Sequence, residues 1–320
     1  MPRPVHRLLT ALLTAALLVL GLTACIATPD SAASGATIRI GTLRGQPHLY
    51  APYFMQRFAP DDKFEIVLFN SSPDIKNALA SGAVDFGVLG APSTLSAIAA
   101  GQRLKIVASA ADGGSGFVGR PEITDVAALR GKKIGFPAGS SQEIALRLTL
   151  GAHGLDPETD VELVNLEYSD MVNAYTSGRI DAFLSAETGV SIALRSGAHR
   201  IVSPYDTPIG AVNIVFATRE QLIEQDRDRV RRTVDSFVKA IGHMRGDRAA
   251  WAQGLVDTFG VDRAVTETAI DNVTLRYALD EEYRRRVGAL AAQMVAFDQL
   301  AQAPDMTTVF DAGFLPGGAP

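Results

Sequence analysis

Cysteine is nearly absent from this chain of 320 residues, which contains a single one. One cysteine argues against a disulfide scaffold, a cysteine-based zinc site and a Cys-x-x-Cys redox pair. The five histidines show no metal-ligand spacing, and neither a Gly-x-Ser-x-Gly elbow nor a phosphate-binding loop occurs. A surplus of basic charge is also missing, because 30 Lys and Arg stand against 35 Asp and Glu. This balance argues against nucleic acid as a partner. From the cysteine, histidine and motif patterns we expect no metal and no cofactor.

The N-terminal segment has the features of an export signal. Arg3 and Arg7 precede an uncharged, Leu- and Ala-rich run at 8–22, which is shorter than the roughly 20 apolar residues of a membrane-spanning helix. The sequence LTAC that follows resembles the bacterial lipobox, in which the cysteine takes a diacylglyceryl group and acyl chains such as palmitate. We expect residues 1–24 to be a cleaved signal peptide and Cys25 to be lipidated; a buried, unmodified thiol is the alternative.

Residues 25–36 are small and polar after their second position, which is typical of a flexible tether. The protein is therefore expected on the extracytoplasmic face of a bacterial cell membrane, held there by its lipid. Without the signal peptide its net charge deepens to -7.

An internal duplication organises the rest of the chain. Residues 72–101 recur as 168–197 at a constant offset of 96, with eight identities in 30 positions. In each copy a short helix ends at a glycine, and an apolar strand and a second helix follow. This alternation predicts two similar α/β lobes, each with a mostly parallel sheet, and a ligand cleft between them. Asp85 and Asp181 recur just before the strand of each copy, where we expect a structural role.

Beyond residue 215 the pattern turns helical. Thr218 is expected to cap a long amphipathic helix, and further helices are expected at 249–259, 262–276 and 283–300. Their packing is expected to complete the first lobe.

The order of the motifs resembles a known family. The lipobox, the strand IRIG, the run ALRGKKIGFPAGSS and the repeat SGRIDAF are similar to those of the nitrate/sulfonate/taurine and thiamine-precursor group of solute-binding proteins. The resemblance implies an α/β, two-lobed type II periplasmic-binding-protein fold that closes on a small solute. It places lobe 1 at 37–111, lobe 2 at 112–208 and the completion of lobe 1 at 209–320. It also implies a monomer whose partners are the permease and ATPase of an ABC importer.

Relatives in this family usually place ligand contacts after the first strand, which here gives Arg44, Gln46 and His48. We expect Arg44 to pair with an anionic group of the ligand, with a solvent-facing loop position as the alternative. His48 is expected to form hydrogen bonds in the loop rather than to act as a catalytic base.

Three polar turns supply further candidates for ligand binding. Ser140 and Ser141 begin a predicted helix, and a helix N-terminus suits a sulfonate, nitrate or carboxylate. Ser93 and Thr94 stand at the equivalent helix start of the first lobe, and Ser71 lies in a third polar turn. For each of these residues, capping of its own helix is the alternative.

Two residues of the second lobe complete the candidate set. Tyr168 is expected to line the cleft, and Glu187 to accept hydrogen bonds from an amine or a heterocycle. An acid that stabilises the dipole of its own helix is the alternative for Glu187. Many relatives have Trp-acid-Pro where this chain has Ala186-Glu187-Thr188, so an aromatic on which a ligand would stack is lost.

We therefore predict an extracytoplasmic substrate-binding lipoprotein of an ABC importer. Its ligand is expected among sulfonates, taurine, nitrate and pyrimidine-type solutes, and the residues do not choose between them. A ligand-sensing lipoprotein without a transport role is one alternative. An enzyme of the pyrimidine-synthase or desulfinase kind is another, although such relatives depend on internal cysteines and the only cysteine here lies in the lipobox.

Overall fold

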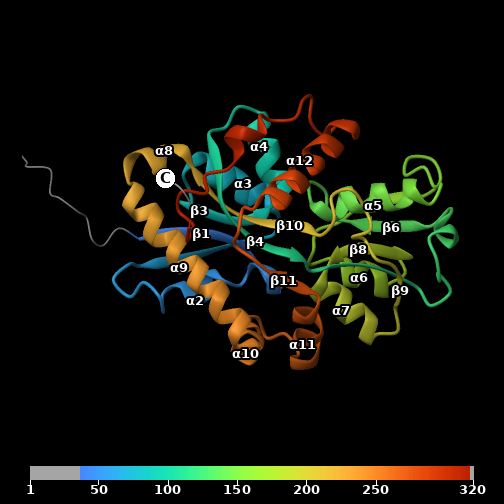
Figure 1. Cartoon of the computed structure of the whole chain (residues 1–320). Coiled ribbons are helices and arrows are strands. Elements are labelled where there is room, and N and C mark those ends of the chain that lie inside the picture. Colours follow the sequence, from blue (N-terminus) through green and yellow to red (C-terminus); the bar gives the residue numbers. More distant parts are fainter. Residues whose placement is uncertain (1–36, 318–320) are drawn as a thin grey trace, which may run out of the picture. The chain divides into compact units, whose positions relative to one another are not determined.

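The structure, a computed structural model, describes residues 37–317. The predicted signal peptide, Cys25 and the tether lie outside the described residues. Two α/β lobes, each built on its own sheet, make up the described range (Figure 1), which confirms the predicted fold class. No helix within residues 37–317 has both the length and the apolar character to cross a membrane.

The first lobe is built on a sheet of six strands. Their order in space is β11 (Val273–Leu275), β4 (Leu104–Gly113), β10 (Val212–Arg219), β3 (Phe86–Gly90), β1 (Ile38–Leu43) and β2 (Phe64–Phe69). The strand β1 is parallel to β2 and β3, whereas β10 is antiparallel to both β3 and β4.

The second lobe is built on a sheet of five strands. Their order is β7 (Glu162–Asn165), β6 (Lys133–Phe136), β8 (Ala182–Ala186), β5 (Ser115–Gly119) and β9 (His199–Val202). The strand β6 is parallel to β7 and β8, and β5 is antiparallel to β8 and β9. The strands β2, β1, β3, β10 and β4 of the first lobe thus show the same succession of parallel and antiparallel pairs as β7, β6, β8, β5 and β9 of the second. Both sheets are mixed rather than mostly parallel, because the strands that carry the chain between the lobes run against their neighbours.

The duplicated segments form helices on either side of one strand in both lobes. These helices are α3 (Ser72–Ser81) and α4 (Ala91–Ala99) in the first copy, and α6 (Met171–Thr176) and α7 (Glu187–Arg195) in the second. Left-handed glycines follow α3 and α6, since Gly82 and Gly178 both have a φ of 80°. The copies differ at their start, because Ser71 caps α3 with its side chain whereas Asp170 makes no such bond to α6.

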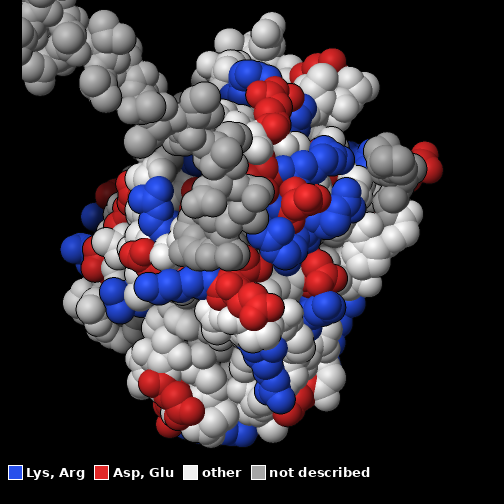
Figure 2. Space-filling model, turned by 90° about the vertical axis from the view of Figure 1, so that its left-hand side faces the viewer, with Lys and Arg blue, Asp and Glu red and all other residues white. Residues whose placement is uncertain are grey.

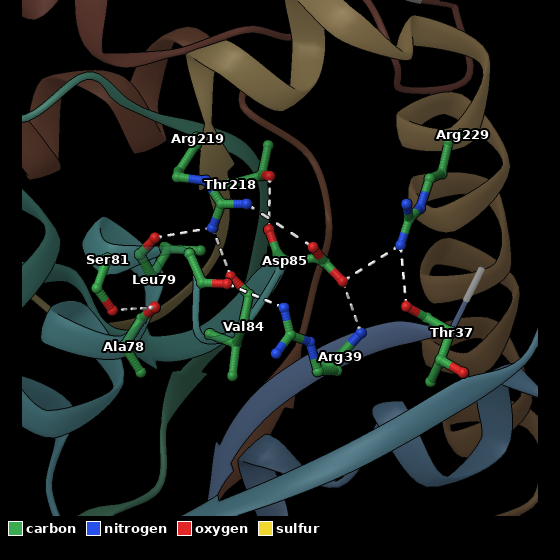
Figure 3. Close-up of polar contacts among 11 residues, drawn as sticks. Thr37, Arg39, Ala78, Leu79, Ser81, Val84, Asp85, Thr218, Arg219 and Arg229 are labelled. Carbon is green, nitrogen blue, oxygen red and sulfur yellow. Dashed lines mark hydrogen bonds and ion pairs between the residues drawn. The ribbon is translucent and has the colours of Figure 1, made fainter. Parts of the chain in front are cut away.

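Asp85 connects three segments of the first lobe (Figure 3). Its Oδ2 accepts hydrogen bonds from the backbone N–H of Arg39 at 2.9 Å and from the guanidinium of Arg229 at 3.2 Å. The guanidinium of Arg219 lies 3.7 Å from the other carboxylate oxygen. Thr218 Oγ1 donates to the carbonyl of Asp85 at 2.8 Å. The prediction that Thr218 caps a helix is wrong. Thr218 belongs to β10, and its hydroxyl donates to the backbone of Asp85 rather than to a helix N-terminus.

The C-terminal part contains the helices α8 (Glu220–Gln225), α9 (Arg227–Gly246), α10 (Arg248–Phe259), α11 (Arg263–Asp271), α12 (Glu281–Ala296) and α13 (Met306–Val309). The helices α8, α9, α12 and α13 contact strands of the first sheet, whereas α11 packs mainly against α7 of the second lobe. Phe237 of α9 stacks on Phe216 of β10 with ring centroids 4.1 Å apart, and Phe216 stacks on Phe86 of β3 at 5.1 Å. The helix predicted over 262–276 ends early, because the residues after Asp271 form β11 on the edge of β4.

Charges of both signs are interspersed on the face that Figure 2 shows. The helix α8 forms ion pairs through Glu220 and Glu224, whose carboxylates lie 2.7 Å and 2.6 Å from the guanidinium of Arg103. Arg232 of α9 lies 3.4 Å from the carboxylate of Asp62. Such exposed pairs contribute little to stability. They do balance the charges of the polar helix faces.

The chain passes between the sheets twice, from β4 to β5 and from β9 to β10. The first passage runs through Gly113 and Gly114, which have φ of 74° and 70°. A Cβ on Gly114 would lie 2.8 Å from Nδ1 of His48, so glycine is required there by both conformation and space. The short segments η1 (Pro47–Leu49), α2 (Pro52–Met55), η2 (Ala127–Leu129) and the longer α5 (Ser141–Ala152) complete the described elements.

Candidate functional site

A cavity of about 480 Å³ lies between the two lobes. The first lobe lines it at the ends of β1 and β2 with Leu43, Arg44, Gly45, Gln46, Phe69 and Asn70. The second lobe lines it around the starts of α6 and α7 with Tyr168, Ser169, Val172, Asn173, Thr188, Gly189 and Ile192. Ligands of open α/β sheets bind beyond the carboxyl ends of strands. The cleft predicted between the lobes is therefore confirmed, and three predicted residues, Arg44, Gln46 and Tyr168, meet in its wall.

A smaller cavity of about 220 Å³ shares Tyr168 with the first. Its wall also includes Ser71 and Ser140, the N-caps of α3 and α5. Each serine oxygen accepts a hydrogen bond at 3.2 Å from the backbone N–H three residues later. Both serines thus cap their own helices and also border a cavity. Tyr168 donates its hydroxyl to Oε1 of Gln142 at 3.1 Å, which fixes the ring between the two cavities.

The two cavities differ in charge. Arg44 is exposed, and it is the only charged residue in the described wall of the larger cavity. Glu167 borders the smaller cavity, where burial, and then the negative charges of Asp74 and Asp170, raise the pKa of its carboxyl. An anionic group therefore fits the larger cavity beside the guanidinium.

Three of the predicted residues, Gln46, Ser141 and His48, have buried polar atoms without a partner among the described residues. Gln46 is 7% exposed, and its Oε1 accepts no hydrogen bond. Ser141, in the first turn of α5, has an Oγ in the same situation. Buried polar atoms are nearly always paired. Gln46 lies in the wall of the larger cavity, but its unpaired Oε1 is itself buried behind the surface of that wall.

His48 lies behind the wall of the cavity rather than in it. The residue is 2% exposed, packs against Gly114 and has an Nδ1 without a partner in the described part of the chain. Burial lowers the pKa of His48 to about 3, so its ring is neutral at neutral pH. His48 lines neither of the two cavities, so the structure does not place it where the predicted ligand contact would require.

Ser93 and Thr94 are absent from the described walls of both cavities. Ser93 Oγ donates to the carbonyl of Gly139, in the second lobe, at 3.0 Å. Thr94 Oγ1 lies 3.4 Å from the carbonyl of Gly90, four residues earlier. Both hydroxyls thus find partners within the protein instead of facing the larger cavity.

Glu187 is fully buried and turned away from the two cavities. Its carboxylate accepts hydrogen bonds from Ser191 Oγ at 3.0 Å, from the guanidinium of Arg200 at 3.2 Å, and from the side-chain amide of Asn272. Both carboxylate oxygens therefore have donors within the protein. The structure therefore does not bring Glu187 to the other candidates, and its neighbour Thr188 takes the place in the cavity wall.

Sequence reasoning missed several residues of the wall. Phe69, Val172 and Ile192 give the larger cavity an apolar side, and single apolar residues carry no signal that separates a cavity from a core. The amide of Asn173 was missed as well, whereas Asn70 belongs to the polar turn of Ser71 that the sequence singled out. Asn173 did carry a signal, because it is one of the identities of the duplication.

A two-lobed α/β fold with a cleft between its lobes is the fold of periplasmic binding proteins. The structure matches that of the alkanesulfonate-binding protein SsuA from Xanthomonas axonopodis pv. citri bound to MOPS, with a TM-score of 0.75 and 24% identity. The match covers 87% of this chain and 98% of that one. The sequence pattern of the NMT1/THI5-like family matches residues 63–248. The chain belongs to this NMT1/THI5-like family.

Two curated proteins show further similarity. A protein of Brucella abortus, named as a candidate binding protein, is 40% identical over 116 residues, which are 36% of this chain and 35% of that protein. The match thus spans about a third of the length of that relative. A protein of Escherichia coli, named as a candidate aliphatic sulfonates-binding protein, is 25% identical over 246 residues, 75% of this chain and 76% of its own. Both relatives are named as binding proteins rather than enzymes.

Proposed function

We propose that the chain is the substrate-binding protein of an ABC importer and captures a small solute of the alkanesulfonate type between its lobes. The lining of the larger cavity carries this proposal. Arg44 places a cation in a wall that has no carboxylate among its described residues, and Phe69, Val172 and Ile192 supply an apolar side. A sulfonate on a short alkyl chain has a matching anionic end and apolar end. The names of two similar proteins point to the same class.

In this proposal the guanidinium of Arg44 forms a charge-assisted bidentate pair with the sulfonate. The side-chain amides of Asn70 and Asn173 donate their N–H groups to the sulfonate oxygens and so orient the solute. Because the wall is divided between the lobes, parting of the lobes opens the cavity and releases the solute to a permease, which an ATPase drives.

Thermal-shift screening of the purified protein against nitrate, taurine, alkanesulfonates and pyrimidines tests the proposal. We expect alkanesulfonates to raise the melting temperature with concentration, because a ligand bound only by the folded state stabilises it by mass action. Arg44→Ala should abolish this shift. Arg195→Ala is the matched control, since Arg195 is exposed and lies outside the described wall of the cavity. The proposal is wrong if no small solute shifts the melting temperature.

The location of the protein is part of the same proposal. A lipid on Cys25 holds it at the extracytoplasmic face of the membrane, and residues 26–36 serve as the tether. Cys25→Ala should move the protein from the membrane fraction to the soluble fraction without changing the affinity of the purified protein for its solute. Loss of binding in the soluble variant would contradict this role of Cys25.

A further inference from the structure

Two hydroxyl groups cross the cleft in opposite directions. Ser93 of the first lobe donates to the carbonyl oxygen of Gly139 in the second lobe at 3.0 Å. Thr188 of the second lobe donates to the carbonyl oxygen of Gly45 in the first lobe at 2.8 Å. Each lobe therefore gives one hydroxyl and one carbonyl to the other.

The four residues occupy similar places in the two lobes, although Ser93 and Thr188 are one position out of step in the duplication, whose offset of 96 pairs Thr188 with Pro92. Ser93 and Thr188 stand in the first turns of α4 and α7, the helices that directly follow β3 and β8. Gly45 and Gly139 lie in the turns after β1 and β6, with φ of 68° and 69°. Because β1 corresponds to β6 and β3 to β8, the same pair of elements makes both bonds. The duplicated elements therefore make a similar interlobe hydrogen bond twice, once from each lobe to the other.

Gly139 allows a close approach of the two lobes on its side of the contact, whereas a Cβ on Gly45 would meet no atom within 4 Å. A Cβ on Gly139 would lie 3.3 Å from Cγ of Pro73 in the first lobe, and its left-handed φ also disfavours a side chain. Glycine therefore lets the turn after β6 approach the first lobe until its carbonyl meets Ser93. On the other side, Thr188 and Gly45 both line the larger cavity. Their bond closes part of the cavity wall.

We propose that Ser93 and Thr188 form a reciprocal latch, here called the cleft latch, that holds the two lobes closed. Water replaces the partner of each group when the lobes part, so each bond favours closure only modestly, by about fivefold in the closed-to-open ratio. Two independent bonds favour it by about 25-fold. The latch thereby slows release of a solute from the cavity, and this consequence rests on the proposed function.

Distances between spin labels on the two lobes test the latch without any solute. Ser81→Cys and Ser177→Cys supply the labelling sites in a chain that also carries Cys25→Ser, because Ser81 and Ser177 are exposed and correspond in the duplication. We expect the labelled parent chain to show the distance of the closed arrangement described above. Adding Ser93→Ala and Thr188→Val together should produce a second, longer distance, and each change alone should produce less of it.

Two matched variants separate the latch from general effects of substitution. Ser96→Ala with Ser196→Ala removes a hydroxyl from α4 and one from the end of α7 that bonds to its own helix, and it should leave the distances of the parent. Thr188→Ser keeps the hydroxyl and should behave like the parent. The latch is refuted if the parent is already open, or if the Ser93 and Thr188 double variant keeps the parent's distances. A failed solute screen would leave this result standing.

Discussion

Asp85 and Asp181 make the same pair of hydrogen bonds in the two lobes. Oδ2 of Asp85 accepts from the backbone N–H of Arg39 at 2.9 Å, and the backbone N–H of Asp85 donates to the carbonyl of Arg39 at 2.8 Å. Asp181 does the same with Lys133 at 3.0 Å and 2.8 Å. Each aspartate ties the residues before its strand to the neighbouring parallel strand. The structural role predicted for the two aspartates is confirmed by these contacts.

Replacing the two aspartates should have unequal effects. The side chain of Asp85 is 11% exposed and pairs with Arg219 and Arg229, whereas that of Asp181 is 30% exposed and lies 3.5 Å from the guanidinium of Arg120. Asp85→Asn leaves two half-buried guanidinium groups without a counter-charge. We expect it to lower the free energy of unfolding by about 2–3 kcal/mol, and Asp181→Asn by about 1 kcal/mol. Urea unfolding measures both losses, and equal losses would contradict the comparison.

Gly114→Ala should destabilise the passage between the lobes. The residue has a left-handed backbone, and the new Cβ would meet the ring of His48. Gly131→Ala is a matched control, since Gly131 has a similar φ of 73° and no atom within 4 Å of the added Cβ. We expect a loss of about 1 kcal/mol at Gly131 from backbone strain alone, and of about 3 kcal/mol at Gly114. Thermal or urea unfolding measures both losses of stability. Equal losses would contradict the prediction, because they would mean that the ring of His48 moves aside at no cost.

The buried ring of His48 should make the protein less stable in mild acid. Burial lowers its pKa to about 3, so between that value and the ordinary pKa the unfolded chain binds a proton that the folded chain does not. Stability is full above the ordinary pKa and falls as the pH drops below it, by about 2 kcal/mol between pH 7 and pH 5. His48→Leu should remove this part of the pH dependence, whereas His199→Leu, at an exposed position, should keep it. The measurement is the change in the free energy of unfolding with pH. A loss of stability that the substitution causes equally at every pH does not affect this change.

The carboxyl of Glu167 should make closure of the lobes depend on pH. Burial, and then Asp74 and Asp170, raise its pKa in the described arrangement, and Asp74 belongs to the opposite lobe. The closed arrangement therefore holds a proton on Glu167 more firmly than an open one does. The closed fraction, measured with the labels described above, should rise as the pH falls from 7 toward the ordinary range of a carboxyl group. Glu167→Gln should flatten this dependence, and Glu122→Gln, at an exposed site outside the described cavity walls, should not.

The repeat of 96 residues was enough to predict two α/β lobes and the cleft between them. Helix ends at glycines and apolar strands are local features, and a repeated local pattern implies a repeated structure. The directions of β5 and β10 could not be predicted in this way. Each of these strands pairs with a partner that depends on where the chain passes between the lobes, which is a long-range property.

The candidate site was predicted by region more closely than by residue. Glu187 and Thr188 both follow β8, and the sequence favoured the charged residue of the two. Which side chain faces the cavity depends on the rotation of the first turn of α7. Arg200 and Asn272, distant in sequence, hold Glu187 on the inner side. Partners of this kind leave no trace in local spacing.

The two passages between the sheets also set the order in which the lobes can assemble during synthesis. The second lobe's sheet, from β5 to β9, is built from one continuous stretch of chain. In the first lobe, β4 pairs with β10 and β11 and forms a bridge from Ile106 to Phe310, and all three partners are synthesised after the whole second lobe. Domains generally fold as units while the chain emerges. The lobe that comes second in the sequence is therefore the first to complete its sheet. The strand β4 has no neighbouring strand in its own sheet until β10 and β11 have been synthesised.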